Sequence, residues 1–594
     1  MSMSICLRCL KRALILPELS SSRAAFSTSA SLHANPTKKK AVVPKTLAKA
    51  GRTLRLAKNK RVVTARPPAA GERKALRKKV VLSNTNALEV PGLAELSTEI
   101  VRDGAQLKAL EGKVVGFGAE TAEALRCLEG FKPGQGWHLF RRPAALLRKD
   151  GVEMGEAIQR AREEKTVERR VVFGDKGSGK SVLLLQSMAM PYLQGWVVIH
   201  FPEARDITNA QTPYEPVQTA DGKTAYVQPR YIASILSNIA AANRALLNDL
   251  RITQQHNLPI PLQSNISLTR LVELGANDAQ LAWPIWQAFL SEITAPSQPE
   301  KQGGLRPPVF VGMDGVDHIM RMSAYLDTDM KPIHAHDLAI AQSFTAMLSG
   351  KTHLANGGMI MAATSASTRP SVPTLDHFLA RAYALGHAEP LKAMRDALLE
   401  QTKVTVYDGD LAPLEQLNTS AMHPEVAAQV LELKYGIHHL QENDASLEKL
   451  QGFLQRFKVR LPKAAVWDAY LPKDENVVAV MESGVRVTKV AGLSKDEARS
   501  VMEYYARSGM LRGSPVTEGL VGEKWTLAGG GIIGELEKGT VAIPSRQLCA
   551  TKGRPRLASA PAGILDFPFD SAQIRDNITA LFMASIMTVV LCLV

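Results

Sequence analysis

Residues 171–181, with the sequence VVFGDKGSGKS, decide the fold class of this chain. They contain a complete G-x-x-x-x-G-K-S phosphate loop, with β-branched residues before it and the apolar run 182–190 after it. Glycine permits backbone angles that side chains forbid and lets the backbone approach phosphate oxygens closely. Backbone N–H groups at a helix N-terminus then attract an anion. The pattern predicts a strand, a phosphate-binding loop and a helix, rather than an ordinary Gly-rich turn.

The whole loop is predicted to contact a nucleotide. Its residues are Gly174, Asp175, Lys176, Gly177, Ser178, Gly179, Lys180 and Ser181. Lys180 is expected to reach the β- and γ-phosphates, and the Ser181 hydroxyl to complete a Mg²⁺ shell. The chain has no N-K-x-D guanine signature of the small GTPase type. The residues alone therefore do not decide between a guanine nucleotide, GTP or GDP, and ATP.

A second apolar strand, residues 309–313, ends at Asp314. An aspartate in this position can hold Mg²⁺ directly or through water, although it can also simply cap the next turn. The phosphate loop upstream favours the metal role, so Ser181 and Asp314 are the predicted metal ligands.

The residues needed for hydrolysis are less evident. Gly315 follows Asp314, where ATPases with an added strand between the phosphate-loop and Asp strands carry a glutamate that orients the attacking water. Asp317 could substitute for it. Thr364 and Ser365 lie where a polar γ-phosphate sensor is expected, but they can equally form a turn. Arg369 is nearby, and the sequence does not distinguish an arginine finger from a solvated arginine. No catalytic residue is assigned.

Charge is concentrated at the N-terminus. The chain has 594 residues and a net charge of +15, but residues 1–80 hold 20 Lys and Arg against two acids. Residues 1–35 are basic, poor in acids and rich in Ser and Ala, which predicts a mitochondrial presequence and a matrix protein. Residues 36–90 are expected to be disordered, either as a linker or as an arm that binds RNA phosphates, and we favour RNA. Five cysteines give no disulfide framework, and Cys6 and Cys9 have a metal-like spacing without a second pair, so neither disulfides nor a zinc site is predicted.

Apolar strands alternate with helical segments from about residue 150 to 365, which predicts a parallel α/β sheet with helices on both faces. The expected strands are the one before the phosphate loop, 196–201, 309–313 and 358–365. The expected domains are a presequence (1–35), a basic arm (36–90), a helical segment (91–150), a nucleotide-binding domain (151–395), a helical C-terminal domain (396–550) and a tail (551–594).

The C-terminal domain is expected to contain a winged-helix-like lid. Ser494 and Glu497 form a capping-box pattern, and Gly509 is a natural end for the helix that follows. Residues 510–513 and 524–527 are predicted to form a β-hairpin after that helix. The apolar run 580–594 is shorter than the ~20 residues of a membrane-spanning helix. A buried helix or an error in the gene model is therefore favoured over a membrane anchor.

These motifs, taken together, resemble one family. They are the phosphate loop, residues 140–147 (FRRPAALL), residues 196–204 (WVVIHFPEA), Asp314 with its strand, residues 493–509 and residues 524–539. The set is similar to the family of mitochondrial ribosomal small-subunit protein twenty-nine, also called death-associated protein three, in its fungal form. The resemblance covers roughly residues 135–545 and is weakest over 400–480.

The resemblance implies an AAA-like P-loop protein in the mitochondrial small subunit that binds GTP or GDP with Mg²⁺. It implies contacts with small-subunit rRNA, with neighbouring ribosomal proteins and with the large subunit. The alternative reading of the residues is an active AAA-like matrix NTPase, a motor or a switch, which would need a catalytic glutamate and an arginine finger.

Overall fold

The computed structural model describes residues 80–219, 222–263, 265–301, 303–368, 370–404, 424–442, 447–459, 467, 470–511 and 515–541. All of them belong to one compact unit, Ala69–Val594. The predicted presequence, most of the basic arm and the C-terminal tail lie outside these residues.

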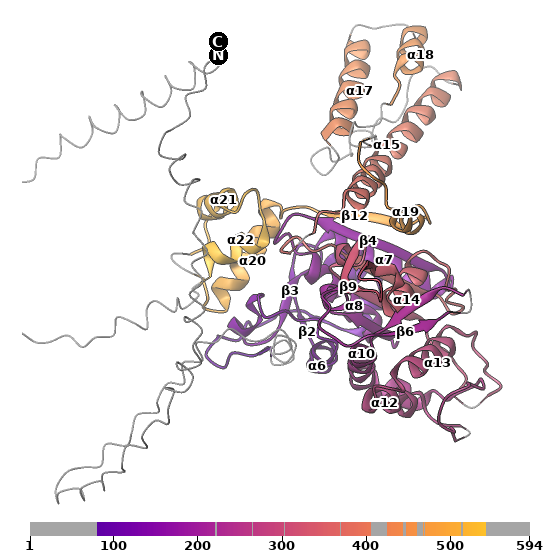
Figure 1. The fold of residues 1–594 in the computed structure, drawn as a ribbon. Coiled ribbons are helices and arrows are strands. Elements are labelled where there is room, and N and C mark those ends of the chain that lie inside the picture. Colours follow the sequence, from indigo (N-terminus) through magenta and orange to yellow (C-terminus); the bar gives the residue numbers. More distant parts are fainter. Residues whose placement is uncertain are drawn as a thin grey trace, which may run out of the picture. The chain divides into compact units, whose positions relative to one another are not determined.

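Five parallel strands form the central sheet, in the order β12-β4-β11-β8-β5 (Figure 1). Their bounds are β4 Val167–Gly174, β5 Val197–Phe201, β8 Val309–Asp314, β11 Gly358–Ala363 and β12 Arg486–Val490. The first four agree with the predicted strands. They are short and largely apolar, as expected for a parallel sheet buried on both faces.

The register of β11 positions the two predicted ligand-binding turns. Ala363 pairs with Val172 of β4 on one side and with Asp314 of β8 on the other. The phosphate loop and Asp314 therefore lie at the same edge of the sheet, with one strand between them. This order is compatible with a P-loop-like fold that has an added strand.

Helices cover both faces of the sheet. Successive residues of a strand point to opposite faces, so each strand contributes apolar side chains to the core on both sides. Val172, Phe310 and Met361 belong to one apolar cluster with helices α7 Lys149–Glu163 and α8 Lys180–Leu193. Val171 and Val311 belong to the other. Its helices are α10 Pro229–Ala242, α12 Leu268–Asn277, α13 Ala282–Thr294 and α14 Ala339–Leu348. The predicted layered α/β arrangement is confirmed.

The segment 91–150 is not purely helical, as the sequence had suggested. It contains a small sheet of β1 Glu95–Leu96, β2 Val114–Phe117 and β3 Ala144–Leu146. The helices between these strands are α4 Thr98–Arg102, α5 Gly104–Ala109 and α6 Ala119–Cys127, followed by the short η2 Gly136–Leu139. Strands of two to four residues carry too little periodicity to be recognised.

The end of the predicted arm, residues 80–90, is ordered. The Asn84 N–H donates to the Phe140 carbonyl at 2.8 Å, and the Leu88 N–H donates to the Ser508 carbonyl at 3.2 Å. Val90 is buried in a cluster with residues of helix α20, Lys495–Arg507. The boundary at residue 90 was therefore placed too late, because these residues have apolar side chains to bury.

Shorter elements complete the core. The hairpin strands are β6 Glu215–Gln218, β7 Thr224–Val227, β9 Met322–Leu326 and β10 Pro332–His334, and the short helices are α9 Arg205–Thr208, α11 Arg244–Asp249, η3 Val316–His318 and η4 Ala335–Asp337. The segment between β5 and α10 thus contains the paired strands β6 and β7.

The region after residue 370 begins with the long helix α15 Pro373–Val404, so the predicted boundary at residue 395 falls inside a helix. Helices α17 Pro424–Glu442, α18 Leu447–Arg456 and α19 Glu475–Met481 follow. The chain then returns to the sheet as β12, which the sequence did not predict. Arg486 and Lys489 are the charged residues of this edge strand, and edge strands often carry such charges.

The capping box is confirmed, but the predicted hairpin is wrong. Ser494 and Glu497 cap α20 Lys495–Arg507, and Gly509 has a φ of 73°. Lys524 lies inside helix α21 Glu518–Leu527, and α22 Ile533–Thr540 follows it. Leu511 makes only an isolated bridge with Val541. A helix replaces the second expected strand, and it begins at a Thr517 N-cap whose hydroxyl accepts the Leu520 N–H.

Within the described residues, no helix is long and apolar enough to span a membrane.

Candidate functional site

The phosphate loop connects β4 to α8 in the predicted way. Gly177 has a φ of 77° and Gly179 a φ of 104°, which residues with side chains rarely adopt. Helix α8 starts at Lys180, directly after Gly179. Asp175, Lys176 and Gly177 form the exposed part of the loop. The glycines in the motif therefore set the turn that aims the helix N-terminus at the open side.

The backbone of the loop is suited to an anion. Among the described residues, the N–H groups of Lys176, Gly177 and Gly179 have no hydrogen-bond acceptor. The Ser178 side chain is 2% exposed, and its hydroxyl has no partner in the same part of the chain. Buried polar groups without partners are unusual in proteins. A polyphosphate would supply acceptors for all of them.

Lys180 lies across the loop. Its ammonium group donates to the carbonyls of Gly174 at 2.9 Å and Asp175 at 2.7 Å, and its side chain is buried. Ser181, in the first turn of α8, is half-buried. Lys180 is thus held where its charge can meet a phosphate bound by the loop.

Asp314 is buried at the end of β8 and forms an ion pair with Lys132. Lys132 has no local sequence signal, because it lies 182 positions earlier in an unremarkable turn, and only the fold brings the two together. The Asp314 carbonyl also accepts the Ala204 N–H at 2.8 Å. The predicted metal ligand therefore already has a cationic partner in the protein.

The neighbouring acid, Asp317, is fully buried, and its Oδ1 accepts the Ser365 N–H at 2.7 Å. This bond ties the turn after β8 to the end of β11. Gly315 occupies the position of the missing glutamate with a φ of 81°. Asp317 is thus engaged in holding the backbone and is poorly placed to receive a proton from water.

The predicted sensor residues are also engaged. Thr364 is buried, and its N–H donates to the Val172 carbonyl at 2.9 Å. The Ser365 hydroxyl hydrogen-bonds with the Thr368 hydroxyl at 3.1 Å. Arg369 lies outside the described residues.

The C-terminal helices pack against the phosphate loop, which the sequence did not indicate. The Gly534 N–H, at the start of α22, donates to the Gly177 carbonyl at 3.0 Å. Arg148 also connects the N-terminal part of the domain to the C-terminal region, because its guanidinium group donates to the carbonyls of Ala491 and Gly492, each at 3.0 Å. The loop therefore lies against residues more than 300 positions away.

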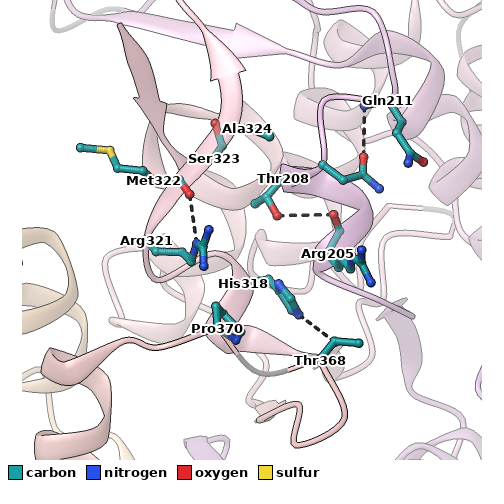
Figure 2. A pocket seen from close by; sticks show the side chains of 11 residues that line it. Arg205, Thr208, Gln211, His318, Arg321, Met322, Ser323, Ala324, Thr368 and Pro370 are labelled. Carbon is teal, nitrogen blue, oxygen red and sulfur yellow. Dashed lines mark hydrogen bonds between the residues drawn. The ribbon is translucent and has the colours of Figure 1, made fainter. Parts of the chain in front are cut away.

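An open groove of about 490 Å³ lies beside the turn after β8 (Figure 2). Arg205, His318, Arg321 and Thr368 are among its lining residues, and no residue of the phosphate loop lines it. Burial, together with the charges of Arg205 and Arg321, lowers the pKa of His318 to about 4. With a neutral histidine and two guanidinium groups, the groove favours an anionic ligand over a cation.

The metal ligands predicted from the sequence would need help from a bound phosphate. Within the described residues, no group of three or more His, Cys, Asp or Glu side chains is placed to hold a metal ion. Ser181 and Asp314 fit a Mg²⁺ ion only if nucleotide oxygens complete its shell and Lys132 releases the carboxylate.

Comparison with known proteins identifies the family. The family model described as mitochondrial ribosomal death-associated protein 3 matches residues 145–539. The chain belongs to this family. The match agrees with the span expected from the motifs, and it confirms the predicted location in the mitochondrial ribosome of the matrix.

Three relatives are each named small ribosomal subunit protein mS29. The Neurospora crassa protein is 32% identical over 486 residues, which are 82% of this chain and 85% of the relative. The Schizosaccharomyces pombe protein is 22% identical, over 56% of this chain and 66% of the relative. The Bos taurus protein is 23% identical, over 35% of this chain and 51% of the relative. The fungal character of the chain agrees with the longer match to Neurospora crassa.

Proposed function

We propose that this chain is a structural component of the mitochondrial small ribosomal subunit that retains a guanine nucleotide, GTP or GDP, as part of its fold. The ribosomal part is supported by the family and by the names of its relatives. The nucleotide part is supported by one observation above all: the loop from Gly174 to Ser181 presents N–H groups that have no acceptor in the described part of the chain. ATP remains the alternative ligand.

In this proposal, the loop holds the phosphates through its backbone, and Lys180 neutralises their charge. Ser181 and Asp314 are the residues that would hold Mg²⁺ between phosphate oxygens. A ligand that binds only the folded state stabilises it by RT ln(1 + [L]/Kd), about 4 kcal/mol at a thousandfold excess over Kd. The nucleotide would therefore strengthen the loop and the helices packed on it.

An active matrix NTPase is the second candidate, and the turn after β8 argues against it. Gly315 provides no base, and Asp317 is occupied by the Ser365 N–H. Hydrolysis needs a group that orients water beside the terminal phosphate. Neither Gly315 nor the bonded Oδ1 of Asp317 provides such a group.

High-salt sedimentation of mitochondrial lysate, followed by nucleotide extraction, tests the proposal. We expect the protein to travel with the small subunit and to carry close to one guanine nucleotide per copy. If the protein sediments alone and purified protein steadily releases inorganic phosphate from GTP or ATP, the enzyme is the better description. If it sediments with the subunit but yields no nucleotide, only the ribosomal part stands.

The proposed partners are small-subunit rRNA, neighbouring small-subunit proteins and, across the subunit interface, the large subunit. The basic arm supports the rRNA contact, since Lys and Arg side chains that neutralise phosphates release counterions and make binding depend on salt. Deleting residues 36–79, the part of the arm outside the described residues, should weaken attachment and flatten its salt dependence. Measuring retention on subunits over a KCl series checks this, and an unchanged slope would mean that the arm is a spacer.

A further inference from the structure

The ion pair between Lys132 and Asp314 carries a further inference about the metal site. The Asp314 side chain is 4% exposed, whereas the Lys132 side chain is 31% exposed. The carboxylate is therefore enclosed by protein, and the ammonium group approaches it from a more open side. An ionised carboxylate in such a place is stable only with a cation or several donors beside it.

The turn that carries Lys132 is held in place independently of Asp314. The Lys132 N–H donates to the Gln135 side-chain oxygen at 3.1 Å, and the same oxygen accepts the Trp137 indole N–H at 2.6 Å. Phe131 is buried and contacts Trp137 edge-on, with ring centroids 5.0 Å apart. The backbone at Lys132 is thus fixed, while the long side chain can rotate toward solvent.

Lys132 and a divalent cation cannot both lie against the Asp314 carboxylate without repelling each other. Two like charges a few ångströms apart in a partly buried site repel strongly, since the interaction scales inversely with the local dielectric constant. We propose that Lys132 is the resident counter-ion of Asp314 and competes with Mg²⁺ for its carboxylate. The proposal deepens the nucleotide site described above and rests on it for the source of the metal.

This competition makes Mg²⁺ binding at Asp314 depend on whether a nucleotide is bound. Without nucleotide, Lys132 satisfies Asp314, so free Mg²⁺ gains little by binding there. When phosphate oxygens and Ser181 add ligands, Mg²⁺ can displace the ammonium group, which is then free to face the phosphates. Lys132 would in this way limit metal binding to the nucleotide-loaded state.

Thermal unfolding of the nucleotide-free, full-length protein, with and without millimolar MgCl₂, tests this. We expect the Tm of the wild-type protein to respond little to Mg²⁺. Lys132→Met should lower the Tm by about 5 °C without metal, because Asp314 is left as an uncompensated buried acid, and Mg²⁺ should restore most of the loss. The double variant Lys132→Met/Asp314→Asn should lose the response to Mg²⁺. Lys331→Met, at a lysine whose side chain is 75% exposed, is the control.

Titration with Mn²⁺, followed by electron paramagnetic resonance, measures the competition directly. Lys132→Met should bind Mn²⁺ at least tenfold more tightly than the wild-type protein, and Asp314→Asn should abolish the gain. If Lys132→Met does not fold, Lys132→Gln serves the same purpose. Tight Mn²⁺ binding by the nucleotide-free wild-type protein, removed by Asp314→Asn, would overturn the proposal without any variant at Lys132.

These measurements contain no nucleotide, so they separate the two proposals. A protein that never binds GTP or GDP would fail the extraction experiment but could still show the predicted metal response. Equal Mn²⁺ affinity in the wild-type protein and Lys132→Met would contradict the role of Lys132 alone.

Discussion

The turn after β4 and the turn after β8 lie at the same edge of the sheet, yet they differ in what they leave available. The phosphate loop after β4 keeps several N–H groups and the Ser178 hydroxyl without partners in the described chain. In the turn after β8, Asp314 is paired with Lys132, and Asp317 Oδ1 accepts the Ser365 N–H. We call the phosphate loop the open turn, because its donors are available to a ligand. We call the turn after β8 the closed turn, because its two acids bind other residues of the protein.

This difference separates binding from hydrolysis in physical terms. Gripping a phosphate requires preorganised donors, which the first turn has. Cleaving it requires, in addition, a group that positions water. In the turn after β8, Asp314 and Asp317 instead bind other residues of the protein. Under the proposed function, the chain would therefore retain a nucleotide without hydrolysing it.

The largest effect should come from Lys180→Ala, which removes the charge from the open turn. A charge-assisted contact contributes about 1.5–3 kcal/mol, so affinity for GDP should fall by roughly 10- to 100-fold. Isothermal titration calorimetry on the purified protein measures it. Lys331→Ala, in an exposed turn far along the chain, is the matched control. Unchanged affinity in Lys180→Ala would mean that the loop does not grip phosphate as described.

Asp317→Asn tests the closed turn. The substitution keeps an oxygen but removes the charge that strengthens the bond to the Ser365 N–H, so the free energy of unfolding should fall by about 1–2 kcal/mol. Nucleotide turnover should remain at background in both proteins. Chemical denaturation and a phosphate-release assay check the two parts, with the exposed Asp329→Asn as control. A variant that keeps its stability but loses measurable turnover would instead make Asp317 a catalytic base.

Gly534→Val tests whether the C-terminal helices support the open turn. A β-carbon at Gly534 would lie 3.2 Å from the Gly177 Cα, whereas one at Gly539, in the same helix, would meet nothing within 4 Å. Gly534→Val should therefore separate α22 from the loop and weaken GDP binding several-fold, while Gly539→Val should not. Both carry the same helix-propensity change, so calorimetry on the pair isolates the contact. Equal affinities would show that the loop holds its shape alone.

The contrast between the turns also explains what the sequence could predict. The phosphate loop is local, because eight neighbouring residues carry both its geometry and its chemistry. The strands predicted at 196–201, 309–313 and 358–365 match the observed strands to within two residues for a similar reason, since each is a short apolar run. The partners of Asp314 and of Gly177 come from residues 132 and 534, and no local pattern signals such pairings.

The same limit applies to the elements that were missed or wrong. Strand β12 has two charged residues among its five, Arg486 and Lys489, so its place in the sheet depends on pairing with β4 rather than on its own hydrophobicity. The predicted hairpin near residues 510–527 followed from residues that also form a helix, and packing against α20 and α22 decides between the two.

The smallest effect concerns pH and involves only the turn after β8, since the phosphate loop contains no histidine. His318 has a folded-state pKa of about 4, below the usual 6.5, because of burial and the nearby charges of Arg205 and Arg321. Between these values the unfolded chain binds the proton first, so this contribution to stability is complete above pH 6.5 and is lost as the pH falls toward 4.

His318→Gln should therefore flatten the decline in stability between pH 7 and pH 5, while His353→Gln, at an exposed histidine, should leave it unchanged. Urea denaturation at several pH values measures both slopes. Because nucleotide binding depends on the other turn, the GDP affinity of His318→Gln at pH 7 should match that of the wild-type protein. A loss of affinity in this variant would mean that the two turns act as one site, and the division between an open and a closed turn would have to be abandoned.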